Sequence, residues 1–396
     1  MQKLYTQMLL IAFLHAAATA SIATVEVLYL RHTLLASYTM IGAILGTAAI
    51  GYLIFAPFLK ELAKATGRGV YLTWTSFILA LAAVFAANIS QPAMYLVSKS
   101  IILLLAPLTF GILMQFIEDE LKFNADTESC YAGLTLTAMI GGIIGFLLAG
   151  KIGVIAYSHG YILSTAAFMI AGFIALGLPT STKQIRKPPA LNPLDRLNTC
   201  FSKKYRHITY IVLATNSYWA IRDITIPLLL IENGYSVLTV GALFAIGAFF
   251  GVISSIITRI LLNKNHPERV MVAALAIGAI ASLLLPFGGL IVLGVLYAIY
   301  MSTEVAISPS LSDRVEETTD NATTYITSLS TASALAWTIT PWIAGILLEA
   351  GVGLRGMLFI GGIIITVAYV VAKHQYLPDK YFPKLSLRKN KKTLTW

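Results

Sequence analysis

The sequence predicts an all-α integral membrane protein, with twelve transmembrane helices arranged as two pseudo-symmetric six-helix bundles. Of its 396 residues, 57% are hydrophobic and only 12% are charged, and soluble domains carry about 25% charged residues. Apolar runs of the length needed to cross a hydrocarbon core, about 20 residues, recur along the chain. A basic, proline-containing segment, 179-207, separates six such runs from six more.

The apolar runs are the predicted spans, and each is expected to be a helix. In the first half they lie near 7-30, 38-59, 70-88, 93-117, 130-150 and 160-178. In the second half they lie near 208-231, 238-258, 270-287, 289-311, 324-348 and 356-372. The first run is too long for the apolar part of a signal peptide. Barrel strands would be shorter, with alternating hydrophobicity.

Lysine and arginine indicate the orientation of these spans. With a cytoplasmic amino terminus, 23 of the 28 basic residues fall on the inner side and three, Arg31, Lys151 and Arg355, on the outer side. Cytoplasmic loops carry such an excess. Both termini are therefore expected in the cytoplasm, and the net charge of +10 marks orientation rather than a nucleic acid partner. Short outer loops favour a bacterial inner membrane.

The resulting organisation has four parts. We expect an N-terminal bundle over 1-178, a cytoplasmic basic linker over 179-207, a C-terminal bundle over 208-372 and a cytoplasmic basic tail over 373-396.

The two halves resemble a repeat. Ile41-Gly42-Ala43-Ile44 opens the second span, and Val240-Gly241-Ala242-Leu243 opens the eighth. Ala149-Gly150 in the fifth span is echoed by Ala344-Gly345 in the eleventh. Small residues let helices approach closely, and duplicated six-span units are typical of secondary transporters that bind substrate between the halves.

These features, with a basic middle loop and both ends inside, resemble the major facilitator superfamily. The fifth span resembles that family's antiporter motif, although Phe146 stands in place of its proline, and the eleventh span keeps the proline as Pro341. The loop after the second span keeps only Gly67 and Arg68 of another family motif. The residues that the resemblance assigns to helix packing or gating are Gly141, Gly145, Gly150, Pro341, Gly345, Gly67 and Arg68.

Five ionisable residues lie inside predicted spans, where a charge costs at least about 2.5 kcal/mol and is rarely kept without a role. They are Glu26, Lys99, Arg222, Asp223 and Glu304. All five fall on the first, fourth, seventh and tenth spans, which line the central cavity in the family that the chain resembles. Lys99 occupies the place of that family's embedded arginine, which the resemblance links to proton handling.

The roles follow from charge and helical spacing. Three embedded acids against two embedded bases leave one excess negative charge, which a proton on one acid would remove. The candidates for proton coupling are therefore Glu26, Asp223 and Glu304, together with Lys99. Arg222 and Asp223 point about 100° apart on a helix, and we expect each to find partners on other spans. His15 is expected to be a packing histidine. The predicted substrate-binding residues on the polar helix faces are Arg222, Asn216, Trp219, Tyr218, Tyr297, Tyr300 and Thr19.

The sequence therefore predicts a transporter that moves a small organic solute by proton-coupled alternating access, with export of an amphipathic, drug-like compound favoured. Import of a siderophore, an organic acid or a sugar is the alternative, and a sensor or lipid-moving protein is a remote one. No nucleotide-binding, zinc-protease or hydrolase motif indicates an enzyme. We expect no metal or cofactor beyond a proton gradient, and a monomer in the lipid bilayer.

Overall fold

The computed structural model describes residues 2-121, 127-179, 198-203, 205-318 and 322-376. Within these residues the chain folds into twelve long helices and no strand. Most of the predicted linker, 180-197 and 204, and residues 377-396 of the predicted tail lie outside the described residues.

The first half contributes six helices. They are α1 (Gln2–Leu28, followed by a π-helical turn Tyr29–Thr33), α2 (Tyr38–Thr66), α3 (Arg68–Ala87), α4 (Pro92–Leu121), α5 (Thr127–Gly153) and α6 (Ser158–Ala175). Ser37 caps α2, because its hydroxyl accepts a 3.1 Å hydrogen bond from the Met40 N–H. Gly67 has a φ of +86° between α2 and α3, a conformation that glycine adopts without strain.

The second half contributes the other six. They are α8 (Arg206–Glu232), α9 (Val237–Lys264), α10 (Pro267–Leu284, followed by a 3-10 turn Leu285–Phe287), α11 (Leu290–Thr318), α12 (Ala322–Glu349) and α13 (Leu354–Tyr376). Eleven of the twelve described helices have the length and hydropathy of a membrane span. The exception is α8, whose apolar run is interrupted by Asn216, Arg222 and Asp223.

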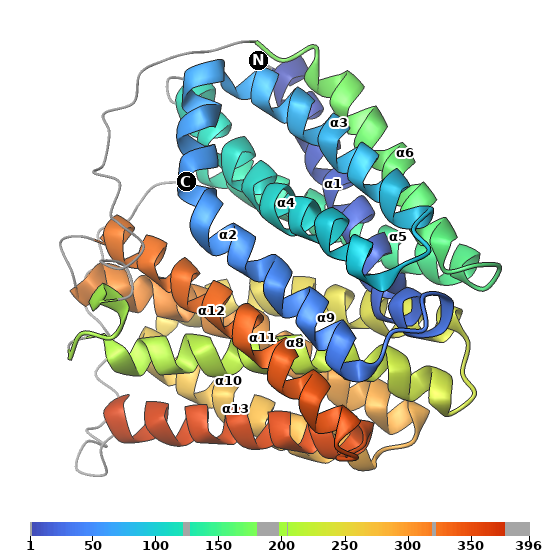
Figure 1. The fold of residues 1–396 in the computed structure, drawn as a ribbon. Coiled ribbons are helices and arrows are strands. Elements are labelled where there is room, and N and C mark those ends of the chain that lie inside the picture. The colour runs from blue at the N-terminus through green and yellow to red at the C-terminus, as the bar shows by residue number, and fades with distance from the viewer. Residues whose placement is uncertain (1, 122–126, 180–197, 204, 319–321, 377–396) are drawn as a thin grey trace.

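The helices form two bundles that follow the two halves of the chain. In the N-terminal bundle α1 packs against α5 and α6, α3 against α4 and α6, and α2 against α4. In the C-terminal bundle α8 packs against α12 and α13, α10 against α11 and α13, and α9 against α11. The architecture is thus the predicted twelve-helix fold (Figure 1).

The bundles meet through two equivalent helix pairs, α2 with α12 and α5 with α9. A Cβ added to Gly42 would collide with the carbonyl oxygen of Pro341, and one added to Gly241 would collide with that of Phe146. A Cβ on Gly345 would lie 3.2 Å from Cα of Gly42, and one on Gly150 would lie 3.1 Å from Cα of Gly241. The sequence echoes therefore mark pseudo-symmetric contacts in which two backbones touch.

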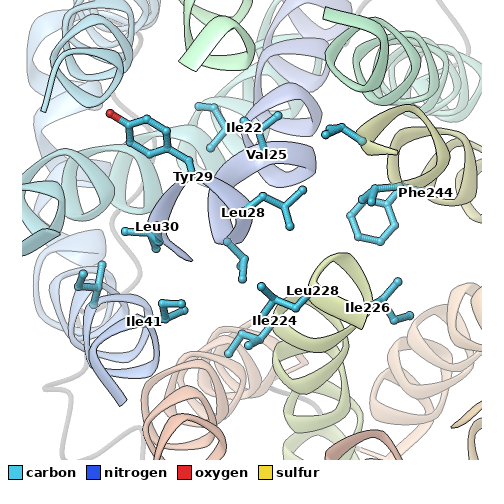
Figure 2. Packing of buried hydrophobic residues seen from close by; sticks show 14 of the residues in the cluster. Ile22, Val25, Leu28, Tyr29, Leu30, Ile41, Ile224, Ile226, Leu228 and Phe244 are labelled. Atoms are coloured by element: carbon cyan, nitrogen blue, oxygen red, sulfur yellow. The ribbon is translucent and has the colours of Figure 1, made fainter. Parts of the chain in front are cut away.

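These inter-bundle contacts gather at one end of the molecule, where α1 ends and α2 begins. We call this the far end, and the opposite end, where α1 begins, the terminal end. In Figure 1, α2 and α12 lie side by side at the far end and separate towards the terminal end. An apolar core closes the far end: Figure 2 shows Leu28 of α1 facing Leu228 and Ile224 of α8, within one buried cluster that spans both bundles.

Candidate functional site

A cavity of about 380 Å³ lies between the two bundles. The N-terminal bundle lines it through α1, α2 and α4, and the C-terminal bundle lines it through α8 and α12. Its lining residues are Thr19, Ala23, Glu26, Val27, Leu45, Ala49, Tyr52, Lys99, Leu103, Pro107, Ala220, Asp223, Ile224, Ser330, Ser333, Ala334, Trp337 and Pro341. Three of the five embedded charges, Glu26, Lys99 and Asp223, thus face one space between the two halves.

Glu26 and Lys99 form an ion pair on the N-terminal wall of this cavity. The Lys99 ammonium donates to Glu26 Oε2 at 2.6 Å, and the side chains are only 13% and 9% exposed respectively. Tyr95 donates to the other carboxylate oxygen, Oε1, at 2.7 Å. Because the hydroxyl proton of Tyr95 is used in this way, the 2.6 Å contact between Tyr95 and Tyr161 is donated by Tyr161. Glu26 therefore holds α1, α4 and α6 together and is matched one to one by Lys99.

Arg222 and Asp223 form a second ion pair, in the C-terminal bundle. The prediction that these neighbours would not pair with each other was wrong. The guanidinium folds back along α8 and donates from Nε at 2.9 Å and from Nη2 at 2.6 Å, both to Asp223 Oδ1. The side chain of arginine is long enough to cover the 100° between adjacent positions on the helix, although the two Cβ atoms point in different directions. Arg222 is buried, whereas the Asp223 side chain is 35% exposed.

Glu304 on α11 lies close to the same guanidinium. Its Oε2 is 3.8 Å from Arg222 Nη1 and accepts no hydrogen bond from the described residues. Arg222 Nη1 instead donates to the Met301 sulfur at 2.8 Å. The guanidinium also lies 4.8 Å from the Trp219 ring centroid and 5.7 Å from that of Tyr297, distances typical of cation–π contacts. One cation in this cluster thus serves two carboxylates.

Asn216 connects α8 to α12 behind the cavity wall. Its Oδ1 accepts from the Ser333 hydroxyl at 2.6 Å and from the Trp337 indole N–H at 3.2 Å. Its Nδ2 donates to the Val212 carbonyl at 2.8 Å. Asn216 itself does not line the central cavity, but two of its partners, Ser333 and Trp337, do.

The remaining predicted substrate-binding residues are divided between cavity and core. Thr19 lines the cavity. Tyr218 and Tyr300 are buried and pack edge to face at 4.5 Å inside the C-terminal bundle, where Trp219 lies against them. Tyr297 is buried beside Phe244 at 6.0 Å. In this conformation the four aromatic residues surround the Arg222 cluster and do not line the cavity.

The predicted packing and gating residues lie at helix contacts. Cβ atoms added to Gly141 and Gly145 of α5 would collide with the carbonyl oxygens of Phe13 and Ala17 on α1. Gly150, Pro341 and Gly345 lie at the inter-bundle contacts described above. Arg68, next to Gly67, is buried and donates to the Gln115 carbonyl on α4 at 2.8 Å.

A side pocket of about 280 Å³ between α1 and α4 adjoins the cavity and shares Glu26 and Lys99 with it. His15 lines this pocket, is 6% exposed and lies 2.8 Å from the Ser76 hydroxyl through Nε2. Its ring packs edge-on against Phe168. Since Ser76 donates its own proton to the Leu72 carbonyl, the Nε2 of His15 is the donor.

The sequence-based prediction missed several residues of the site. Tyr52, Ser330, Ser333 and Trp337 line the cavity, and Tyr95 binds Glu26. The spacing of 330, 333, 337 and 341 on one helix face was a usable signal. For Tyr95 there was none, because its importance comes from the position of Glu26 on another helix.

Twelve helices around a cavity between two halves define a class, the membrane transporters of small solutes. The profile of the Major Facilitator Superfamily matches residues 8–326, and the chain belongs to this family. No curated protein matches the chain significantly by sequence.

Solved structures share the fold at low identity. A variant of the nucleoside transporter NupG superposes with a TM-score of 0.79 at 14% identity, covering 94% of this chain and 100% of that one. A bacterial homologue of the human lysosomal transporter Spinster, in an inward-facing and unoccupied conformation, gives 0.74 at 13% identity, covering 96% and 98%. The human organic anion transporter MFSD10 (TETRAN) gives 0.64 at 15% identity, covering 94% and 99%.

Proposed function

We propose that this transporter exports a small amphipathic organic compound in exchange for protons, by alternating access around the central cavity. The observation that carries the proposal is the uneven charge of the two clusters. Glu26 is neutralised by Lys99, whereas Asp223 and Glu304 share Arg222. An unmatched charge in a membrane-embedded site is expensive, and a proton on one of the two acids removes it.

Glu304 is the proton carrier in this proposal. Asp223 already accepts two hydrogen bonds from Arg222, while Glu304 lies 3.8 Å from the guanidinium and its side chain is 12% exposed. A buried carboxyl whose charge no hydrogen bond stabilises is more stable when it is neutral. If a rearrangement brings Arg222 to Glu304, the proton is released. Movement of the guanidinium between two carboxylates would then link protonation to the shape of the cavity.

The arrangement of the bundles supports alternating access. Backbone contacts at Gly42 and Gly241 close the far end, and α2 and α12 separate towards the terminal end. With the terminal end in the cytoplasm, as the 23 basic residues indicate, this conformation faces inward. Alternation requires the far-end contacts to open while the terminal end closes.

Inside-out membrane vesicles with an acidic lumen test coupling and direction together. Amphipathic amines, organic acids, sugars and nucleosides are offered in turn, and lumen pH and solute uptake are recorded. An exporter accumulates its solute while the lumen becomes more alkaline. The alternative, import of an organic acid or another solute, is favoured by the Lys99 ammonium on the cavity wall. Import predicts accumulation only in right-side-out vesicles with an acidic exterior. If uptake is not linked to protons in either orientation, both the export and the import proposals are wrong.

A further inference from the structure

The carboxylate of Asp223 has one oxygen available to a solute. Both hydrogen bonds from Arg222 go to Oδ1, and within the described residues no hydrogen bond reaches Oδ2. The side chain is 35% exposed and lines the central cavity, while Arg222 is buried behind it. The C-terminal wall therefore presents a negatively charged acceptor whose own cation does not face the cavity.

The same wall presents an indole ring with a fixed orientation. Trp337 lines the cavity, and its only hydrogen-bond donor, Nε1, is held by Asn216 Oδ1 at 3.2 Å. Asn216 is itself fixed, because it accepts from Ser333 and donates to the Val212 carbonyl. The ring is thus held before a solute arrives, which lowers the entropic cost of binding.

Among the described residues that line the opposite wall, none offers a comparable free charge. The Lys99 ammonium lies 2.6 Å from Glu26 and is only 13% exposed. Most of the remaining lining is apolar, including Leu45, Leu103 and Ile224. The net charge that the cavity presents to a solute is therefore that of an anion beside an aromatic ring, and Thr19, Tyr52 and Ser330 add neutral polar groups.

We propose that the cavity recognises an aromatic amine, whose ammonium group binds Asp223 Oδ2 and whose ring packs on Trp337, with Asn216 as the positioning residue of the indole. The proposal rests on the transport function proposed above and specifies its substrate class. An ammonium ion suits a carboxylate acceptor, and an aromatic face attracts both rings and cations.

Three probes of similar size separate the two contacts. Tryptamine carries the ring and the amine, 2-cyclohexylethylamine carries the amine without an aromatic ring, and indole-3-propionate carries the ring with a negative charge. Binding to the purified full-length protein is measured by calorimetry without any proton gradient. We expect tryptamine to bind roughly tenfold more tightly than the cyclohexyl amine, a ratio typical of aromatic and cation–π contacts, and no binding of the acid.

Substitutions assign the contacts. Trp337→Leu should weaken tryptamine roughly tenfold and leave the cyclohexyl amine nearly unchanged, while Trp337→Phe, which keeps a ring, should retain most of the affinity. Asp223→Asn, which still offers an oxygen to Arg222, should weaken both amines. Trp74→Leu on α3 is the matched control, because Trp74 is 64% exposed and lines a different pocket, between α3 and the end of α6. Size-exclusion profiles and melting temperatures show which variants are folded.

A double-mutant cycle tests the positioning role of Asn216. Asn216→Ala should weaken tryptamine in the wild-type background and have no further effect beside Trp337→Phe, because phenylalanine has no N–H to hold. Equal effects in both backgrounds would show that Asn216 does not act through Trp337.

The outcomes separate this proposal from the transport function. If indole-3-propionate binds more tightly than tryptamine, if tryptamine does not bind, or if its affinity is indifferent to Trp337 and Asp223, the amine assignment is wrong, even when vesicles show proton-linked uptake of another solute. If tryptamine binds as expected but no solute moves protons, the recognition stands and the coupling fails.

Discussion

The Tyr38 hydroxyl donates a 2.8 Å hydrogen bond to Glu232 Oε1 and so joins the start of α2 to the end of α8, across the two bundles. Beside it, the Thr39 N–H donates to Glu349 Oε2 at 3.4 Å. Arg31 lies over the Tyr38 ring, 4.3 Å from its centroid. Two carboxylates of the C-terminal bundle thus meet the first turn of α2, where a helix attracts negative charge. These contacts must break when the far end opens.

Tyr38→Phe should therefore shift the protein towards its far-end-open conformation. The variant keeps the ring but loses a hydrogen bond of about 1 kcal/mol, which corresponds to a roughly fivefold change in population. Spin labels at Ile155 and Phe287, exposed far-end positions on the two bundles, report the distance distribution in a background with Cys130 and Cys200 replaced by serine. Tyr210→Phe is the control, and identical distance distributions in the two variants would show that the Tyr38–Glu232 hydrogen bond does not hold the far end closed.

Gly145→Val and Gly142→Val should differ in stability although the two glycines lie on the same helix. A Cβ at Gly145 meets the backbone of Ala17, which cannot move aside, whereas one at Gly142 meets nothing within 4 Å. We expect Gly145→Val to cost about 1–3 kcal/mol of unfolding free energy and Gly142→Val to have little effect. Unfolding in detergent measures both, and equal melting temperatures would rule out the close α1–α5 contact.

Lys99→Met should destabilise the N-terminal bundle by about 3 kcal/mol, because it leaves Glu26 charged and buried beside Tyr95. Adding Glu26→Gln to Lys99→Met removes that charge, so the double variant should regain part of the loss. Thermal unfolding in detergent compares the two with Lys151→Met, which removes an exposed lysine at the end of α5. A single variant as stable as the wild type would mean that the pair does not hold α1 to α4.

Cys200 should resist alkylation near neutral pH. Burial raises the pKa of its thiol from 9.0 to about 11, so the reactive thiolate is scarce. Cys130 is only partly buried and should react first with a maleimide, as mass spectrometry of the labelled peptides would reveal. The raised pKa favours the protonated folded state, so the contribution of Cys200 to stability should be lost as pH rises from about 9 to about 11. Faster labelling of Cys200 than of Cys130 would contradict this burial.

Much of the fold could be predicted from the sequence, because membrane spans can be recognised by their length and hydropathy. The echo of Gly42 by Gly241 even marked two equivalent inter-bundle contacts. Which embedded charges pair with each other was harder to predict from the sequence. Arg222 reaches its own neighbour because its side chain is long, and the separation of Tyr218 and Tyr300 from the cavity depends on how α8 and α11 rotate in the bundle, which helical periodicity leaves open. The orientation of the Trp337 ring depends on a hydrogen bond to Asn216 on another helix, which the sequence does not reveal.

Accumulation by Glu304→Gln in inside-out vesicles tests the proton-coupled mechanism most directly, with the solute that the vesicle screen identifies. Glutamine keeps the size of the side chain but cannot release a proton. The account predicts that the variant still exchanges labelled solute across the membrane without a pH gradient but no longer accumulates it when the lumen is acidic. The control Glu268→Gln on α10 should behave as the wild type. Accumulation by Glu304→Gln at the wild-type level would contradict it.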